Sequence, residues 1–206
     1  MAGFEGAVAY DILPRILAAY RPRFPSVKLV LEQLGTAAQT ATMCDERIDV
    51  GFLCPEGRDP ALLFETVARE PYRAVLPAGH PLASRGRVPL TALADEDFVL
   101  FPRATGVVAY DQIISICEGV GFSPRVTQEA VRYVTIVALV SAGLGVSLVP
   151  ACVENFRRDG VVFRPLKGRV LTLERMMAWR HDAHSEVLAE FLDVVRATSA
   201  STTCAR

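Results

Sequence analysis

Residues 139–150 have the sequence LVSAGLGVSLVP, and this stretch decides the fold. It continues a helical pattern of apolar residues that begins at position 133. We expect the helix to end at Gly143, because helices commonly end at a residue with positive φ. Gly145 then permits a tight turn into a short apolar strand at 146–149. The sequence therefore predicts a helix-to-strand corner here, with a structural role rather than direct contact with a ligand.

Strand and helix patterns alternate along the chain around this corner. Short, mostly apolar strand patterns lie at 3–5, 27–32, 48–53, 62–67, 72–76, 98–101, 126–129, 161–166 and 171–179. Helical patterns with one apolar face lie at 11–20, 36–46, 108–120 and 185–196. This alternation predicts an α/β fold with crossover units on a parallel sheet. The helix N-termini then lie near the carboxyl ends of the strands, the edge at which open α/β sheets bind ligands.

The composition is that of an ordinary globular protein with little net charge. The 206 residues are 51% hydrophobic and 22% charged, and the formal net charge is −1. A DNA-binding domain usually has a basic face, so we expect this chain alone to bind DNA poorly. The N-terminus lacks the features of a secretory signal, and no segment is apolar over the length that a bilayer requires. We therefore expect a cytoplasmic protein without membrane contact.

The residues that most often carry catalysis or bind metals are scattered. The five cysteines form no C-x-x-C pair, which favours reduced, inert thiols over disulfides or a redox pair; they are Cys44, Cys54, Cys117, Cys152 and Cys204. His181 and His184 have the spacing of two helical metal ligands, but no third ligand is evident. The sequence therefore predicts no catalytic residue, no metal site and no cofactor.

Three stretches resemble the effector-binding domain of LysR-type transcriptional regulators. The first comprises YDILP at 10–14 and FPSV at 24–27, the second comprises Gly35-Thr36 and RIDVGF at 47–52, and the third is the corner at 139–150. The HPL sequence at 80–82 also fits this family. The resemblance covers nearly the whole chain, and the corner is its most specific part.

The resemblance implies a fold like that of a type II periplasmic binding protein, with two Rossmann-like lobes joined by two crossover strands. Lobe I would comprise 1–77 and 175–206, and lobe II 78–174, with the ligand cleft between them. It implies a small-molecule effector, often a small organic or aromatic acid, and a homodimer or homotetramer. Full-length members bind DNA through an N-terminal winged helix-turn-helix, which this sequence does not contain.

Candidate ligand contacts follow from helix starts, where unpaired N–H groups and the helix dipole favour an anion. The predicted contacts are Gly6, Ala7, Val8, Thr36, Cys54, Arg103, Thr105, Gly106 and Val107. Thr36 also suits a plain helix cap, and the alternative for Arg103 is an exposed position in a loop. Some family members have serine or threonine where this chain has Gly6-Ala7, and arginine where it has Cys54.

Two other classes of function share the same fold. A solute-binding protein of a transporter is favoured by an export signal in the native gene, and an enzyme by a catalytic set in the cleft. The sequence has neither feature. The prediction is therefore a regulatory domain that senses a ligand, with no enzymatic activity.

Overall fold

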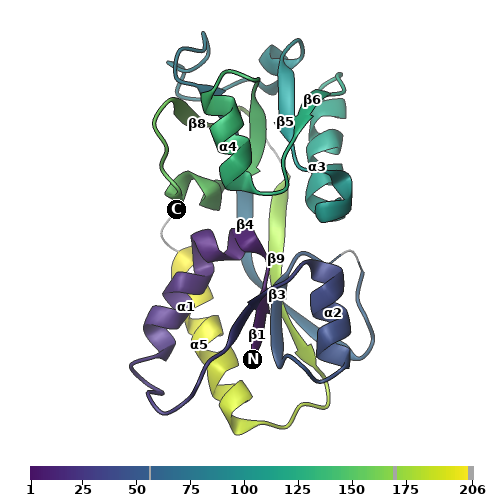
Figure 1. The fold of residues 1–206 in the computed structure, drawn as a ribbon, viewed down its shortest axis with the longest axis vertical. Coiled ribbons are helices and arrows are strands. Elements are labelled where there is room, and N and C mark those ends of the chain that lie inside the picture. The colour runs from purple at the N-terminus through teal and green to yellow at the C-terminus, as the bar shows by residue number, and fades with distance from the viewer. Residues whose placement is uncertain (56, 169–170, 204–206) are drawn as a thin grey trace. The chain divides into compact units, whose positions relative to one another are not determined.

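The computed structural model describes residues 1–55, 57–168 and 171–203, which form two compact units (Figure 1). The first unit comprises Met1–Arg69 and Glu174–Arg206, and the second comprises Glu70–Leu173. The chain passes from the first unit to the second inside strand β4 (Leu62–Pro77), the strand at whose end the family resemblance implied the boundary. The patterns at 62–67 and 72–76 belong to this single strand, because its extended backbone accommodates the fixed φ of Pro71 between them.

The sheet of the first unit is parallel at its start. Strand β1 (Ala2–Phe4) lies between β2 (Leu31–Gln33) and β3 (Val50–Leu53), and both neighbours are parallel to it. Strand β9 (Thr172–Arg180) then pairs with β3 in the antiparallel direction. The predicted parallel arrangement of the first three strands is confirmed, although β2 begins later than the alternating pattern suggested.

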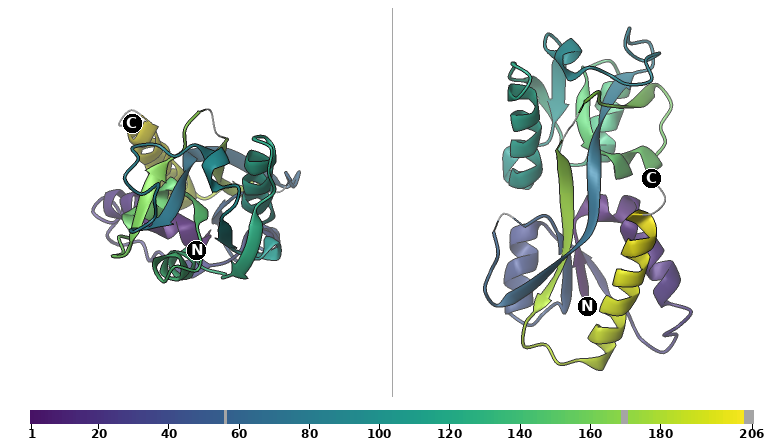
Figure 2. Two further views of the ribbon diagram at one scale, coloured as in Figure 1. Left: turned by 90° about the horizontal axis from the view of Figure 1, so that it is seen from above. Right: turned by 180° about the vertical axis from the view of Figure 1, so that it is seen from behind.

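Helices cover both faces of this sheet. Helix α1 (Ile12–Tyr20) and helix α5 (Glu186–Thr203) lie on one face, and helix α2 (Thr36–Cys44) lies on the other (Figures 1 and 2). A short 3-10 helix, η1 (Gly6–Tyr10), connects β1 to α1. Because each helix has one apolar face, the sheet is buried between two apolar layers.

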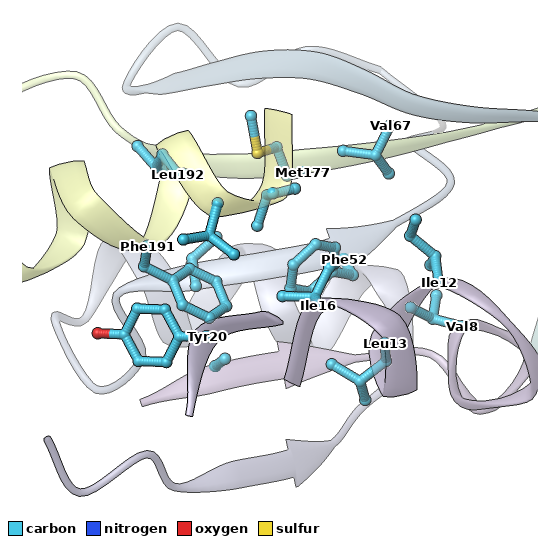
Figure 3. Packing of buried hydrophobic residues seen from close by; sticks show 14 of the residues in the cluster. Val8, Ile12, Leu13, Ile16, Tyr20, Phe52, Val67, Met177, Phe191 and Leu192 are labelled. Atoms are coloured by element: carbon cyan, nitrogen blue, oxygen red, sulfur yellow. The ribbon is translucent and has the colours of Figure 1, made fainter. Parts of the chain in front are cut away.

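The larger of these layers forms the core between α1, α5 and the sheet (Figure 3). Tyr20 of α1 packs edge to face on Phe191 of α5, with 5.0 Å between ring centroids, and Phe191 also contacts Phe52 of β3. Ile16 and Phe52 are completely buried. Each such side chain contributes about 1.5–3 kcal/mol through burial, so this layer holds α1 and α5 on the sheet.

The second unit is built around the second half of β4. The antiparallel strands β7 (Ser147–Pro150) and β8 (Val161–Pro165) both pair with β4. Strands β5 (Asp97–Leu100) and β6 (Arg125–Glu129) form a separate parallel pair. Its helices are α3 (Val107–Glu118) and α4 (Tyr133–Ser141), and its short 3-10 turns are η2 (Leu90–Leu93), η3 (Arg103–Thr105) and η4 (Ala151–Asn155).

The helix-to-strand corner predicted at 139–150 is confirmed. Helix α4 ends just before Gly143, whose φ of +82° is in the left-handed region, and Gly145 has a φ of +138°. The Val146 N–H donates to the Asp97 carbonyl at 2.8 Å, and the Val146 carbonyl accepts from the Val99 N–H at 2.9 Å. The corner thus brings the start of β7 alongside β5.

None of the helices in the described part of the chain combines the length and apolar character needed to cross a lipid bilayer.

Candidate functional site

The carboxyl edge of the parallel strands in the first unit gathers four polar or reactive side chains. Glu5 directly follows β1, Cys54 directly follows β3, and Thr36 is the first residue of α2. Arg175 comes from β9, which runs antiparallel to β3 and passes the point where β3 ends. We call this group, Glu5, Thr36, Cys54 and Arg175, the Glu5–Arg175 cluster.

Hydrogen bonds and an ion pair connect the members of the cluster. The Thr36 hydroxyl donates to Glu5 Oε1 and also lies 3.3 Å from the Cys54 carbonyl oxygen. Arg175 Nη1 lies 3.4 Å from Glu5 Oε2 and 3.5 Å from Cys54 Sγ. The Arg175 side chain is 2% exposed, whereas that of Glu5 is 22% exposed. The Glu5 carboxylate thus links the start of α2 to a buried guanidinium.

Thr36 does not cap α2, which corrects the simpler of the two interpretations of this residue. The N-cap residue is Gly35, and no side chain caps this helix. Because Thr36 lies inside the first turn, its hydroxyl is directed toward Glu5 and the end of β3 rather than toward the N–H groups of its own helix. The hydroxyl therefore belongs to the cluster.

Gln39 fixes the start of α2 against the sheet. This side chain is completely buried, and its Nε2 donates to the Leu34 carbonyl at 2.9 Å and to the Phe52 carbonyl at 3.0 Å. Its amide packs on β1 and β3 at Gly3 and Gly51, where a Cβ on Gly51 would come within 2.8 Å of Gln39 Oε1. The two glycines thus allow α2 to approach the sheet closely and hold Thr36 at its edge.

Sequence reasoning missed Arg175 and Glu5. The available signal was an arginine inside the otherwise apolar strand pattern at 171–179, since a charged residue in such a run needs a buried partner. The family resemblance suggested an arginine at the position of Cys54. In the structure a guanidinium does lie beside Cys54, but it comes from the neighbouring strand β9.

The three predicted contacts at the start of η1 differ in burial. Val8 is 1% exposed and belongs to the core between α1 and α5, and Ala7 is 5% exposed. Gly6 is half-buried, and a Cβ there would come within 3.0 Å of Gln33 Nε2. The structure therefore places Gly6 beside a polar side chain and directs the Val8 side chain into the core.

In the second unit, the predicted contacts lie together around η3 and the start of α3. The Arg103 guanidinium is exposed and makes a two-pronged ion pair with Asp111, with both N–O distances at 2.7 Å. The Thr105 hydroxyl donates to the Pro102 carbonyl at 2.7 Å. Gly106 precedes α3, with Val107 as its first residue. The Arg103 guanidinium, which we predicted to contact an anionic ligand, is thus paired with Asp111.

The ion pair between Arg103 and Asp111 should lower the pKa of the Asp111 carboxyl group. The hydrogen bond from Arg103 is the main cause that lowers the pKa of Asp111 below its ordinary value of 3.8. A carboxylate of this kind stabilises the folded state above its ordinary pKa, and the contribution is lost as the pH falls through the lowered value. In Arg103→Gln, NMR titration should find the Asp111 pKa raised toward 3.8. The control Arg125→Gln removes the Arg125–Asp97 pair and should leave the Asp111 pKa unchanged. An equal rise of the Asp111 pKa in both variants would show that Arg103 is not the cause of its lowered value.

Aromatic residues that sequence analysis did not single out lie near these contacts. The Phe101 ring follows β5 and packs edge to face on Tyr110 of α3, at a centroid distance of 6.1 Å, and on Tyr133 of α4, at 5.6 Å. A Cβ on Gly106 would come within 3.2 Å of the Phe101 ring. Phe101 is 5% exposed, so this aromatic cluster belongs to the packing between β5 and the starts of α3 and α4.

The thiols and histidines show no catalytic arrangement in the described residues. Burial raises the pKa of Cys117 to about 12, which suppresses its reactive thiolate form. Cys204 lies outside the described residues. His181 and His184 precede α5, so they do not share a helical face, and the His181 ring contacts the Ala61 carbonyl. Within the described chain, no three His, Cys, Asp or Glu side chains form a metal-binding group.

The role of Thr36 in the cluster is tested by Thr36→Val, which keeps the shape of the side chain and removes the hydroxyl. Glu5 then loses its donor at the start of α2, and we expect the free energy of unfolding to fall by about 1.5 kcal/mol in urea denaturation. Thr40→Val is the matched control, because the Thr40 hydroxyl bonds only the Thr36 carbonyl of its own helix among the contacts described. The control should cost less than about 0.5 kcal/mol. Equal losses in the two variants would show that the bond to Glu5 contributes nothing.

Comparison with known proteins agrees with this architecture. Residues 3–200 match the family model of the LysR substrate binding domain. The HTH-type transcriptional regulator AlsR of Bacillus subtilis (strain 168) is 33% identical over 192 residues, which are 93% of this chain and 64% of AlsR. The HTH-type transcriptional regulator BenM of Acinetobacter baylyi is 32% identical over 167 residues, which are 80% of this chain and 55% of BenM. The chain thus spans less than two thirds of the length of these relatives.

A solved structure of the BenM effector binding domain with its effector benzoate has a TM-score of 0.89 and 27% sequence identity, and the match covers 100% of this chain and 93% of that one. The predicted fold class, two α/β units of the type II periplasmic-binding-protein kind, is confirmed by this match. By fold and by sequence, the chain belongs to the LysR substrate binding domain family.

Proposed function

We propose that this chain is the ligand-sensing regulatory domain of a LysR-type transcriptional regulator, and that its effector is a small organic or aromatic acid. Membership of the LysR substrate binding domain family and the likeness to the benzoate-bound BenM domain support this function. Effector binding stabilises one state of the full-length regulator over another and thereby controls transcription. The chain itself carries out no catalysis.

The observation that carries this proposal is the buried guanidinium of Arg175, which Glu5 connects to Thr36 at the start of α2. The first N–H groups of a helix lack partners within the helix, and the helix dipole is positive at this end. A guanidinium, a hydroxyl and a helix start together favour a carboxylate ligand.

The remaining features of the regulator follow from the same proposal. DNA is bound by the part of the protein that lies outside this chain, since a net charge of −1 gives the chain no attraction for a polyanion. The domain self-associates as a homodimer or homotetramer, and the regulator acts in the cytoplasm. A transporter's solute-binding protein and an enzyme are the competing functions.

A thermal-shift screen tests the proposal. Benzoate and small aliphatic acids are added to the chain, with benzamide as a neutral analogue of benzoate. An effector that binds only the folded state should stabilise it by about 2.7 kcal/mol at a hundred times its Kd, and the melting temperature should rise as the effector concentration is raised. The acid should be recovered unchanged, because the chain is not an enzyme. Equal shifts from benzoate and benzamide, or consumption of the acid, would contradict the proposed function.

A further inference from the structure

We propose that Glu5 is an internal carboxylate that occupies the anion position of the Glu5–Arg175 cluster, and that an acid effector must displace it to reach Thr36 and Arg175. This inference rests on the proposed function and adds a mechanism of selectivity to it. Glu5 then acts as a specificity-determining residue, because an acid binds only if its contacts exceed those that Glu5 already makes.

The contacts of Glu5 are those expected of a bound acid. One carboxylate oxygen accepts from the Thr36 hydroxyl, and the other lies 3.4 Å from Arg175 Nη1. A carboxylate ligand at the start of α2 would use the same two donors. Because Glu5 directly follows β1, its backbone is fixed at the sheet edge, where its own N–H donates to the Phe52 carbonyl at 3.1 Å.

The burial of the Glu5–Arg175 pair favours replacement of the Glu5 carboxylate by the effector over binding of the effector beside it. Arg175 is 2% exposed, so its charge needs an anionic partner in the folded protein. Glu5 is 22% exposed, so its carboxylate can move into water when another carboxylate replaces it. A second anion placed beside an undisplaced Glu5 would meet like-charge repulsion at low dielectric. Displacement removes this repulsion and keeps Arg175 paired.

The test uses acetate as a probe of the vacated position. Glu5→Ala removes four heavy atoms, the methylene and carboxylate that together have the heavy-atom structure of acetate. Acetate should therefore bind the variant and restore its lost stability. We expect the melting temperature to rise by about 5–10 °C at a hundred times the acetate Kd. Acetamide, which has the same shape without the charge, should give no such rise.

Glu65→Ala is the matched control. It removes the same four atoms from an ion pair of the same unit, but its partner Arg196 is 42% exposed and solvated. Acetate should raise the melting temperatures of the control and the wild type much less than that of Glu5→Ala. An equal response to acetate in Glu5→Ala, Glu65→Ala and the wild type would overturn the proposal.

Glu5→Gln tests the exchange by a second measurement, which remains possible if Glu5→Ala does not fold. The glutamine is neutral and binds Arg175 more weakly than the carboxylate does. Benzoate should therefore bind this variant at least tenfold more tightly than it binds the wild type, and acetate is used where benzoate does not bind. Equal affinities would overturn the exchange while leaving an acid-sensing function intact. Acetate rescue of Glu5→Ala without any acid that binds the wild type would support the internal carboxylate and count against the acid effector.

Discussion

Arg175→Met is expected to lower the free energy of unfolding by about 2 kcal/mol, because the Glu5 carboxylate loses its buried, positively charged partner. Methionine is unbranched and apolar and extends as far as the Nε position of arginine, so it keeps the packing of the aliphatic part of the side chain. The guanidinium contacts Glu5 and Cys54, and its removal deprives the Glu5 carboxylate of its positively charged partner. Urea denaturation, followed by circular dichroism, measures the loss.

The control for this variant is Arg69→Met. Arg69 pairs with Glu174 at 2.6 Å in the same unit, but its side chain is 64% exposed and that of its partner 41%. Exposed pairs contribute at most about 1 kcal/mol, so the control should lose little stability. If both variants lost the same stability, burial of the Arg175 charge would have no energetic consequence.

A double variant separates the ion pair from the packing of Arg175. Adding Glu5→Gln to Arg175→Met removes the unpaired carboxylate, so the double variant should be more stable than Arg175→Met alone. The coupling energy between the two positions should then be about 1–3 kcal/mol. A coupling energy near zero would mean that the contact between Glu5 and Arg175 does not stabilise the folded protein.

The local elements were predictable from the sequence because their signals are local. The apolar residues Ile12, Leu13, Ile16 and Tyr20 recur at helical spacing, and all four are buried on one face of α1. The strand at Val50–Leu53 is completely buried, as its apolar run indicated. The alternation of these elements was sufficient to predict that the first three strands are parallel, since a helix between two strands of one sheet returns the chain in the same direction.

The site was predictable only in part, because its contacts join distant positions. The helix start at Thr36 was found from the sequence, but its partner Glu5 lies 31 residues earlier and Arg175 lies 170 residues after Glu5. No periodicity connects such residues; only the register between β3 and β9 brings Arg175 to the sheet edge. In the same way, the sequence predicted a polar turn at 102–106, but not that this turn pairs Arg103 with Asp111 of α3.

Gly145→Ala is the other substitution for which we expect a large effect. The residue has a φ of +138°, which a side chain rarely tolerates, and an added Cβ would overlap the Asp97 carbonyl oxygen and come within 2.9 Å of the carbonyl carbon. This carbonyl accepts the Val146 N–H, so β5 cannot move away without breaking the hydrogen bonds that join it to the start of β7. The combined strain and overlap should cost about 4 kcal/mol or more.

Gly143→Ala is the matched control, because it tests the conformation of the corner without the overlap. Gly143 has a φ of +82°, and a Cβ there would meet no atom within 4 Å. Its substitution should cost about 1–2 kcal/mol, the usual penalty of the left-handed region. The difference between the two variants in urea denaturation therefore measures the close approach of Gly145 to β5. Similar losses in both would mean that backbone conformation alone, and not contact with Asp97, requires glycine at position 145.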